Sequence, residues 1–169
     1  MPSLEDLVDV VNDCDEVIGQ RRRGELNGNN FRTAHVFLFD EQDRLLLGQL
    51  GRVRTNDPGA WGSSVAAHVL AGESYHAAAT RRLDEELGIA TPLRLICKIA
   101  LAESGGTKFV SLFSGRADGF ENKEPEHVAA LKFTDTQALR RAAADCPENF
   151  TATFRLLLAC YTALTTPQT

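Results

Sequence analysis

Basic residues and long apolar runs are scarce in this chain of 169 residues. Its 18 Lys and Arg residues are outnumbered by 23 Asp and Glu residues, and the formal net charge is −5. Nonspecific binding to nucleic acids or membrane surfaces usually needs a basic surface. No run approaches the roughly 18 apolar residues of a membrane span, and the amino terminus lacks the pattern of a signal peptide. We therefore expect a cytoplasmic protein that binds neither a nucleic-acid polymer nor a membrane.

Cysteine is also scarce, and its spacing is uninformative. The four cysteines, Cys14, Cys97, Cys146 and Cys160, form no CxxC pair. A disulfide framework and a structural zinc site are therefore both disfavoured. The only basic cluster, residues 21–23, precedes a glycine and is interpreted as a solvated turn.

The length and a hydrophobic content of 43% predict a single domain over residues 1–169 with a proper core. A hairpin is expected at about residues 5–20, and helices at about 135–164. Alternating and β-branched segments predict the remaining strands, at residues 33–39, 44–49, 61–69, 93–102, 108–114 and 127–133. The pair 33–39 and 44–49 should form the middle of the sheet. This order of strands and helices predicts an α/β sandwich.

The segment from residue 67 to 89 carries the strongest functional signal. A glycine-containing loop leads into a helix that Ser74 can cap and Gly88 can end. At about 100° per residue, Arg82, Glu85 and Glu86 fall on one side of this helix, beside an apolar stripe. Paired carboxylates suit a hard divalent ion such as Mg²⁺ or Mn²⁺, which leaves room for substrate phosphates. The pattern therefore indicates chemistry on a diphosphate.

The same segment resembles the Nudix box, the signature of the Nudix hydrolase superfamily. Seven of nine fixed positions agree with the signature: Glu73, Arg81, Leu83, Glu85, Glu86, Gly88 and Ile89. Ala67 stands where the signature has Gly, and Arg82 where it has Glu. The resemblance implies a Nudix fold, an α/β/α sandwich with a mixed sheet and a loop-helix that carries the site. It also implies a metal-dependent hydrolase of a diphosphate linkage in a nucleoside diphosphate derivative or related organic diphosphate.

The resemblance extends to individual roles. Glu85 and Glu86 become ligands of Mg²⁺ or Mn²⁺, with the Ala66 backbone carbonyl as a further ligand. Glu73 and Arg81 brace the loop against the helix as an ion pair, supported by Gly72 and Gly88. Glu85 is the first candidate for the base that activates water, and the loop residues Glu103, Glu124 and Glu126 are alternatives.

The residues ahead of the box resemble the branch related to isopentenyl-diphosphate isomerase. The segment 58–69 has the Trp, Ser and His of that branch, and Arg82 also occurs in such isomerases. His68 matches one isomerase metal ligand, with a structural, hydrogen-bonded His as the alternative. Ala66 stands where isomerase chemistry needs a Cys, and the strand from residue 106 offers Gly106 and Lys108 where acidic ligands are expected. Isomerase activity is therefore disfavoured.

Arg82 leaves two functions open. Its exchange for a carboxylate changes the local charge by two units, and its guanidinium can pair with Glu85 and Glu86 in competition with metal. Arg82 either contacts substrate phosphate or weakens catalysis, so the alternative is a module that binds a nucleotide or diphosphate without turnover. The expected partner is a small diphosphate molecule, and a homodimer is a further possibility.

Overall fold

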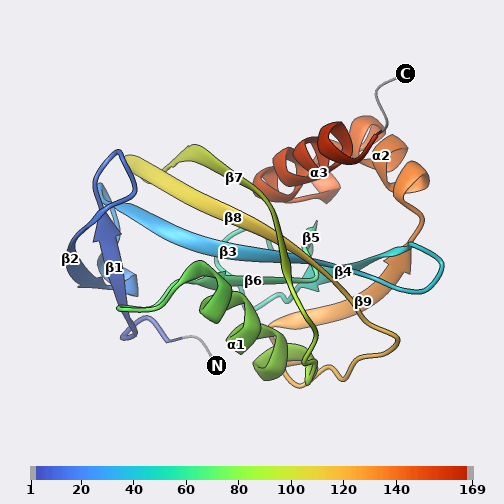
Figure 1. The fold of residues 1–169 in the computed structure, drawn as a ribbon, viewed down its shortest axis with the longest axis horizontal. Coiled ribbons are helices and arrows are strands. Elements are labelled where there is room, and N and C mark those ends of the chain that lie inside the picture. Colours follow the sequence, from blue (N-terminus) through green and yellow to red (C-terminus); the bar gives the residue numbers. More distant parts are fainter. Residues whose placement is uncertain (1–2, 167–169) are drawn as a thin grey trace.

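The computed structural model describes residues 3–166, which form one nine-stranded mixed sheet with helices on both of its faces (Figure 1). The strands are β1 (Leu7–Val11), β2 (Val17–Arg22), β3 (Asn30–Phe39), β4 (Leu45–Leu50), β5 (Trp61–Gly62), β6 (Val65–His68), β7 (Arg94–Glu103), β8 (Gly106–Arg116) and β9 (Val128–Thr134). The α-helices are α1 (Tyr75–Leu87), α2 (Thr136–Asp145) and α3 (Ala152–Thr165), and short 3₁₀ turns are η1 (Arg23–Glu25) and η2 (Pro147–Asn149). None of the described helices is long and apolar enough to cross a membrane.

Strand β3 is the centre of the sheet. It runs parallel to β8 and antiparallel to β1, β4 and β6, while β7 extends the sheet beyond β8 and β9 pairs with β4. The predicted middle pair is confirmed for β3, which is buried on both faces as central strands of such sheets are. The mixed pairing with helices on both sides confirms the predicted fold class.

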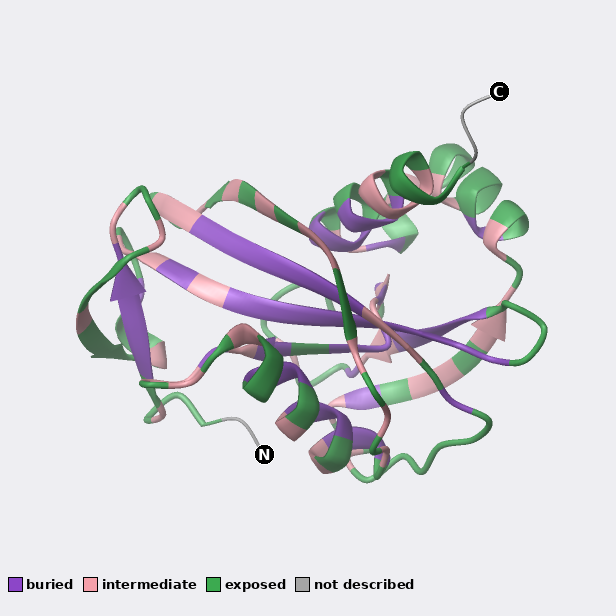
Figure 2. Cartoon of the chain, in the orientation of Figure 1, coloured by how far each residue is buried: buried purple, intermediate pink, exposed green. Residues whose placement is uncertain are grey.

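The two faces of the sheet pack against different helices. Helix α1 buries its apolar stripe, including Ala79, Leu83 and Leu87, against the even-numbered residues of β3 such as Val36. Helix α3 covers the other face, where Phe154 lies in one cluster with apolar residues of β3, β4 and β8. Figure 2 shows the same division, because the sheet is buried along β3 and β8 while the outer sides of the helices are exposed. The site loop before α1 is therefore held against a rigid sheet.

Several strand ends differ from the prediction by up to three residues, such as β3, which begins at Asn30 and not at residue 33. The strand expected at residues 61–69 is divided into β5 and β6. Between them, the Ser64 hydroxyl donates to the Leu46 carbonyl and accepts from the Leu38 amide. The last helix starts at Ala152, because residues 147–149 form η2 and Thr151 caps α3 through the amide of residue 154. The single-domain boundary of 1–169 stays a prediction, and residues 1–2 and 167–169 lie outside the described part.

Candidate active site

Helix α1 begins and ends at the residues that the sequence predicts. The Ser74 hydroxyl accepts from the Ala77 amide at 3.0 Å, which satisfies one of the free amides of the first turn. Gly88 ends the helix with a φ of 65° and donates its amide to the carbonyls of Asp84 and Leu83. An L side chain is disfavoured in that left-handed conformation. These two caps fix where the carboxylates of the last turns of α1 lie.

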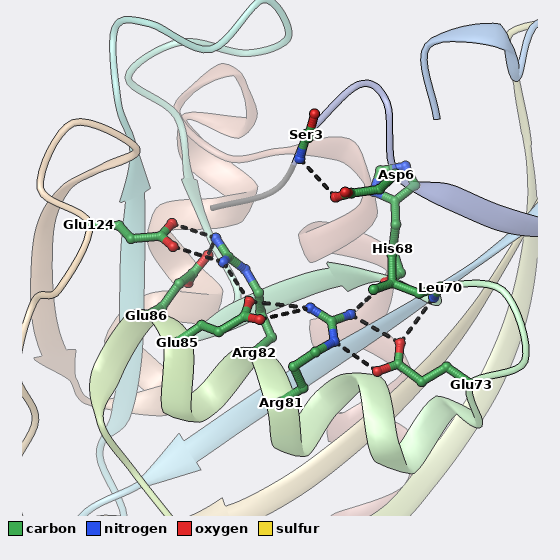
Figure 3. Close-up of polar contacts among 10 residues, drawn as sticks. All are labelled: Ser3, Asp6, His68, Leu70, Glu73, Arg81, Arg82, Glu85, Glu86 and Glu124. Atoms are coloured by element: carbon green, nitrogen blue, oxygen red, sulfur yellow. Dashed lines mark hydrogen bonds and ion pairs between the residues drawn. The ribbon is translucent and has the colours of Figure 1, made fainter. Parts of the chain in front are cut away.

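Glu73 and Arg81 tie the loop to the helix, as their predicted ion pair requires. The guanidinium donates to both carboxylate oxygens of Glu73, at 2.7 and 3.0 Å, and to the His68 carbonyl at 3.2 Å (Figure 3). Glu73 also accepts from the Leu70 amide at 2.9 Å. Burial alone would raise the pKa of Glu73, but the Arg81 contacts outweigh it and the pKa is lowered. The loop from residue 68 to 73 is therefore closed by a bidentate, charge-assisted pair.

Arg82 lies buried among three carboxylates (Figure 3). Only 1% of its side chain is exposed, and it contacts Glu85 at 3.1 Å, Glu86, and both oxygens of Glu124 at 3.1 and 2.8 Å. Burial would lower the pKa of Arg82, but these acidic partners raise it. Glu124 is 42 positions away in sequence, so only the folded loop between β8 and β9 brings it to this cluster. The Arg82 Nε–H remains buried without an acceptor among the described residues.

The pKa values of Glu86 and Glu124 are shifted in opposite directions. Burial raises the pKa of Glu86 to about 7, although the charge of Arg82 acts in the opposite direction. The Arg82 guanidinium lowers the pKa of Glu124 in spite of its burial. Glu85 is more accessible, with 35% of its side chain exposed, and is shared between Arg81 and Arg82. Four carboxylates thus face two guanidinium groups, which leaves an excess of negative charge.

Two further arginines bring positive charge to the same region. The pKa of Arg23, in η1, is lowered by burial and then by the nearby charges of Arg54 and Arg82. The charge of Arg54, from the loop between β4 and β5, also lowers the pKa of Glu86 and of His68. Arg23 is therefore within electrostatic reach of Arg54 and Arg82, while the carboxylate of Asp6 acts on it in the opposite direction. Such a cluster favours an anion, since an anion between them relieves the repulsion.

The sequence gives little indication of these two arginines. The predicted turn is wrong for Arg21 and Arg22, which are exposed but form the end of strand β2. Arg23 begins η1, is half-buried and is the functional candidate of that run. Arg54 stands in no motif, because it lies in a turn-rich loop whose position only the folded sheet determines. Its effect on Arg23 and Glu86 could not be found from spacing.

His68 lies in a cationic environment on the other side of the loop. Its ring stacks on Phe31 with centroids 5.5 Å apart, and burial followed by the charges of Arg23 and Lys108 lowers its pKa to about 3. Ala66, two residues earlier, is exposed and pairs with His35 of β3. The metal roles of His68 and of the Ala66 carbonyl stay predictions. The neighbouring cations disfavour a metal ion at the His68 ring.

The carboxylates of the Nudix box suit a hard cation only if further ligands complete its coordination. Within residues 3–166, no group of three or more His, Cys, Asp and Glu side chains is arranged to hold a metal ion. The Arg82 guanidinium lies among the carboxylates and pairs with their oxygens. The oxygen chemistry and the excess negative charge fit Mg²⁺ or Mn²⁺, and such ions usually keep waters or substrate phosphates as ligands. Glu85 and Glu86 are the residues that would hold the ion.

Comparison with known proteins gives a consistent result. The family model described as "NUDIX domain" matches residues 29–154. The isopentenyl-diphosphate Delta-isomerase of Serratia proteamaculans (strain 568) is 30% identical over 162 residues, which cover 92% of this chain and 90% of that protein. The enzyme of the same name from Streptomyces griseus is 34% identical over 145 residues, covering 78% and 69% of the two chains.

Solved structures support the fold. DR0079 from Deinococcus radiodurans superposes with a TM-score of 0.81 at 24% identity, covering 92% of this chain and 99% of that one. The MutT protein from Methanosarcina mazei Go1 superposes with a TM-score of 0.70 at 13% identity, covering 82% and 96% of the two chains. At these identities the likeness concerns the fold alone.

Proposed function

Because this chain belongs to the Nudix family, we propose that it is a metal-dependent hydrolase that cleaves the diphosphate linkage of a nucleoside diphosphate derivative or related organic diphosphate. One observation carries the proposal: a carboxylate cluster and an arginine cluster meet at Arg82. A diphosphate needs both, because its own charge pairs with guanidinium groups, while the carboxylates would hold a divalent ion that offsets the phosphate charge.

The arginines bind and orient the substrate in this proposal. Arg23 lies within electrostatic reach of Arg54 and Arg82, and the three side chains come from different elements, so a diphosphate near Arg23 would be held by more than one part of the chain. The buried Arg82 Nε–H, which lacks an acceptor, is a further donor for such an oxygen. Fixing the scissile linkage in this way contributes to catalysis by orientation.

The carboxylates hold the metal and handle the proton. Glu85 and Glu86 would hold Mg²⁺ or Mn²⁺, and such an ion would supply charge neutralisation of the phosphates and activation of water. Glu85 remains the first candidate for the base because it is the most accessible carboxylate of the cluster. Among the alternatives, Glu124 is paired with Arg82, Glu103 is paired with Lys108, and Glu126 is exposed.

A second function is favoured by the position of Arg82 itself. A buried guanidinium bound to three carboxylates competes with a metal for the same oxygens. If Arg82 keeps these oxygens and excludes the metal, the chain binds a diphosphate without hydrolysing it. Isomerase activity is not supported, although isomerases are among the relatives, since Ala66 has no thiol and Lys108 pairs with Glu103 and Thr153.

The test is product release from a panel of nucleoside diphosphates and triphosphates, nucleotide sugars and prenyl diphosphates with Mg²⁺ or Mn²⁺. We expect metal-dependent turnover that is lost in Glu86→Gln and unchanged in Glu148→Gln, an exposed control on η2. Absence of turnover, together with thermal stabilisation by a panel compound, would support the binding module instead. Conversion of isopentenyl to dimethylallyl diphosphate by the purified protein would overturn both.

A further inference from the structure

The hairpin of β1 and β2 lies beside the loop that leads into α1 (Figure 1). Val8 of β1 pairs with Leu70 of this loop, and the Leu7 carbonyl accepts from the Ala71 amide at 2.9 Å. The hairpin precedes the residues that match the family model. The loop of the Nudix box is therefore held from outside by a part of the chain that the signature does not include.

A buried carboxylate of β1 holds the turn of this loop. Asp9 is 4% exposed and accepts from the Gly72 amide at 3.0 Å. Gly72 has a φ of 77°, which an L side chain disfavours, and the next amide, of Glu73, donates to the Leu70 carbonyl at 2.9 Å. Asp9 also accepts from the Gln20 side chain of β2 at 3.2 Å. Because a buried carboxylate is costly without such donors, the hairpin and the loop are tied together at Asp9.

The turn of the hairpin holds the first residue of α1. Asp15 accepts from the Tyr75 hydroxyl at 2.9 Å, and only 7% of its side chain is exposed. It also accepts from the Nε of Arg32 at 2.6 Å and pairs with Lys98. Burial would raise the pKa of Asp15, but these partners outweigh it and lower the pKa. Since the partners come from α1, β3 and β7, the ionised carboxylate joins three elements at the start of the helix.

Both contacts reach the carboxylates of α1 through Arg81. The Arg81 guanidinium is shared, because it donates to Glu73 at 2.7 and 3.0 Å and to Glu85 at 3.2 Å. If the loop moved away from the helix, Arg81 would lose Glu73 and would pair with Glu85 alone. Glu85 would then be less available to a metal ion and less well oriented for it. The position of the loop therefore sets how strongly Arg81 occupies Glu85.

We propose that Asp9 and Asp15 are positioning residues for the divalent-cation site on α1. They fix the loop and the start of the helix, so that Arg81 stays paired with Glu73 and Glu85 keeps oxygen atoms for the ion. This inference rests on the proposed function, in which Glu85 and Glu86 would hold Mg²⁺ or Mn²⁺. Changes at residues that support metal ligands without touching the metal commonly alter affinity by about 10- to 100-fold.

The test is isothermal titration calorimetry of the metal-free protein with Mn²⁺. Asp9→Ala and Tyr75→Phe each remove one contact between the hairpin and the box, whereas Asp9→Asn keeps an oxygen that can accept from the Gly72 amide. Asp13→Ala is the matched control, because Asp13 is an exposed residue of the same turn that accepts from Asn30. Thermal melts establish that each variant is folded at the titration temperature. Tyr75→Phe, which removes only a hydroxyl, serves alone if Asp9→Ala does not fold.

We expect Asp9→Ala to weaken Mn²⁺ binding by about 10- to 100-fold and Tyr75→Phe by about fivefold. Asp9→Asn should stay within about threefold of the wild type, and Asp13→Ala should leave the affinity unchanged. In assays with the most active panel compound, the Mg²⁺ concentration for half-maximal rate should rise in the same order. The substrate KM at saturating Mg²⁺ should stay the same, because the substituted side chains do not bind substrate.

The outcomes separate this inference from the function on which it rests. Wild-type Mn²⁺ affinity in folded Asp9→Ala and Tyr75→Phe would overturn the inference and leave the hydrolase proposal intact. An equal loss in Asp9→Asn and Asp9→Ala would also overturn it, since the carboxylate would then act through its charge and not through the Gly72 amide. A wild type that binds no Mn²⁺ and turns over no panel compound would overturn the proposed function together with the inference.

Discussion

Removal of the buried guanidinium in Arg82→Met should destabilise the fold in a way that depends on pH and Mg²⁺. Methionine fills a similar apolar volume but removes the guanidinium that contacts both Glu86 and Glu124. The side chain of Glu86 is only 8% exposed, so water cannot replace that partner fully. Breaking a buried ion pair from one side commonly costs about 3–5 kcal/mol.

The pH dependence follows from the direction of the Glu86 shift. Its pKa is already raised to about 7 by burial, and the charge of Arg82 opposes that rise. Without Arg82 the pKa rises further. A raised carboxyl pKa favours the folded state at low pH, and that stability is lost as pH rises from the unfolded value through the folded one. The variant should therefore be least stable at pH 8 and partly recover at pH 6.

Thermal unfolding followed by circular dichroism at pH 6 and pH 8, with and without Mg²⁺, checks this prediction. For a domain of this size about 3–5 kcal/mol corresponds to a fall in Tm of about 6–20 °C. Mg²⁺ should raise the Tm of Arg82→Met more than that of the wild type, because the freed carboxylates bind the ion in the folded state only. The control Arg155→Met changes an exposed arginine of α3 and should shift Tm by less than about 2 °C. A variant as stable as the wild type, with no response to pH or Mg²⁺, would refute the role assigned to Arg82.

Three shorter predictions address the same site and its frame. Metal-dependent turnover should increase as pH rises through about 7, since metal binding requires Glu86 to be ionised; a flat profile of initial rates between about pH 5.5 and 8.5 would contradict this. In steady-state assays Arg54→Met should raise KM about tenfold with little change in kcat, whereas the exposed neighbour in Arg52→Met should have no effect. Gly106→Ala should strongly lower the midpoint of urea-induced unfolding, because its Cβ would lie 2.2 Å from the Asn29 carbonyl oxygen. An unchanged midpoint would contradict this and show that the backbone near Asn29 moves to accommodate the methyl group.

The local part of the site could be predicted from the sequence. Ser74 and Gly88 are residues whose chemistry caps a helix, and the structure has them at those positions. Glu73 and Arg81 lie at a fixed spacing across one loop and the first turns of a helix, so a single helical geometry brings them together. Such contacts can be predicted from spacing alone, because the short segment between the two residues allows few relative positions.

The burial of Arg82 could not be predicted in the same way. Helical periodicity places it beside Glu85 and Glu86 but is equally compatible with a solvated surface, on which each pair contributes only a few tenths of a kcal/mol. What buries it is Glu124, from a loop whose path depends on the pairing of β9 with β4. Arg54 likewise reaches the site through the loop between β4 and β5. Contacts that depend on sheet assembly carry no local signature.

Glu124 also compensates part of the positive charge that Arg82 brings to the carboxylate cluster. An Arg in place of the signature Glu removes one negative charge and adds one positive charge, and Glu124 returns one negative charge to the same guanidinium. The exchange is therefore half offset, and the cluster of carboxylates keeps an excess of negative charge. The charges of Arg54 and Arg82 both reach Arg23, and that of Arg54 also reaches Glu86, so carboxylates and guanidinium groups share one region. A metal diphosphate complex carries both charges and therefore matches a region that offers partners of both signs.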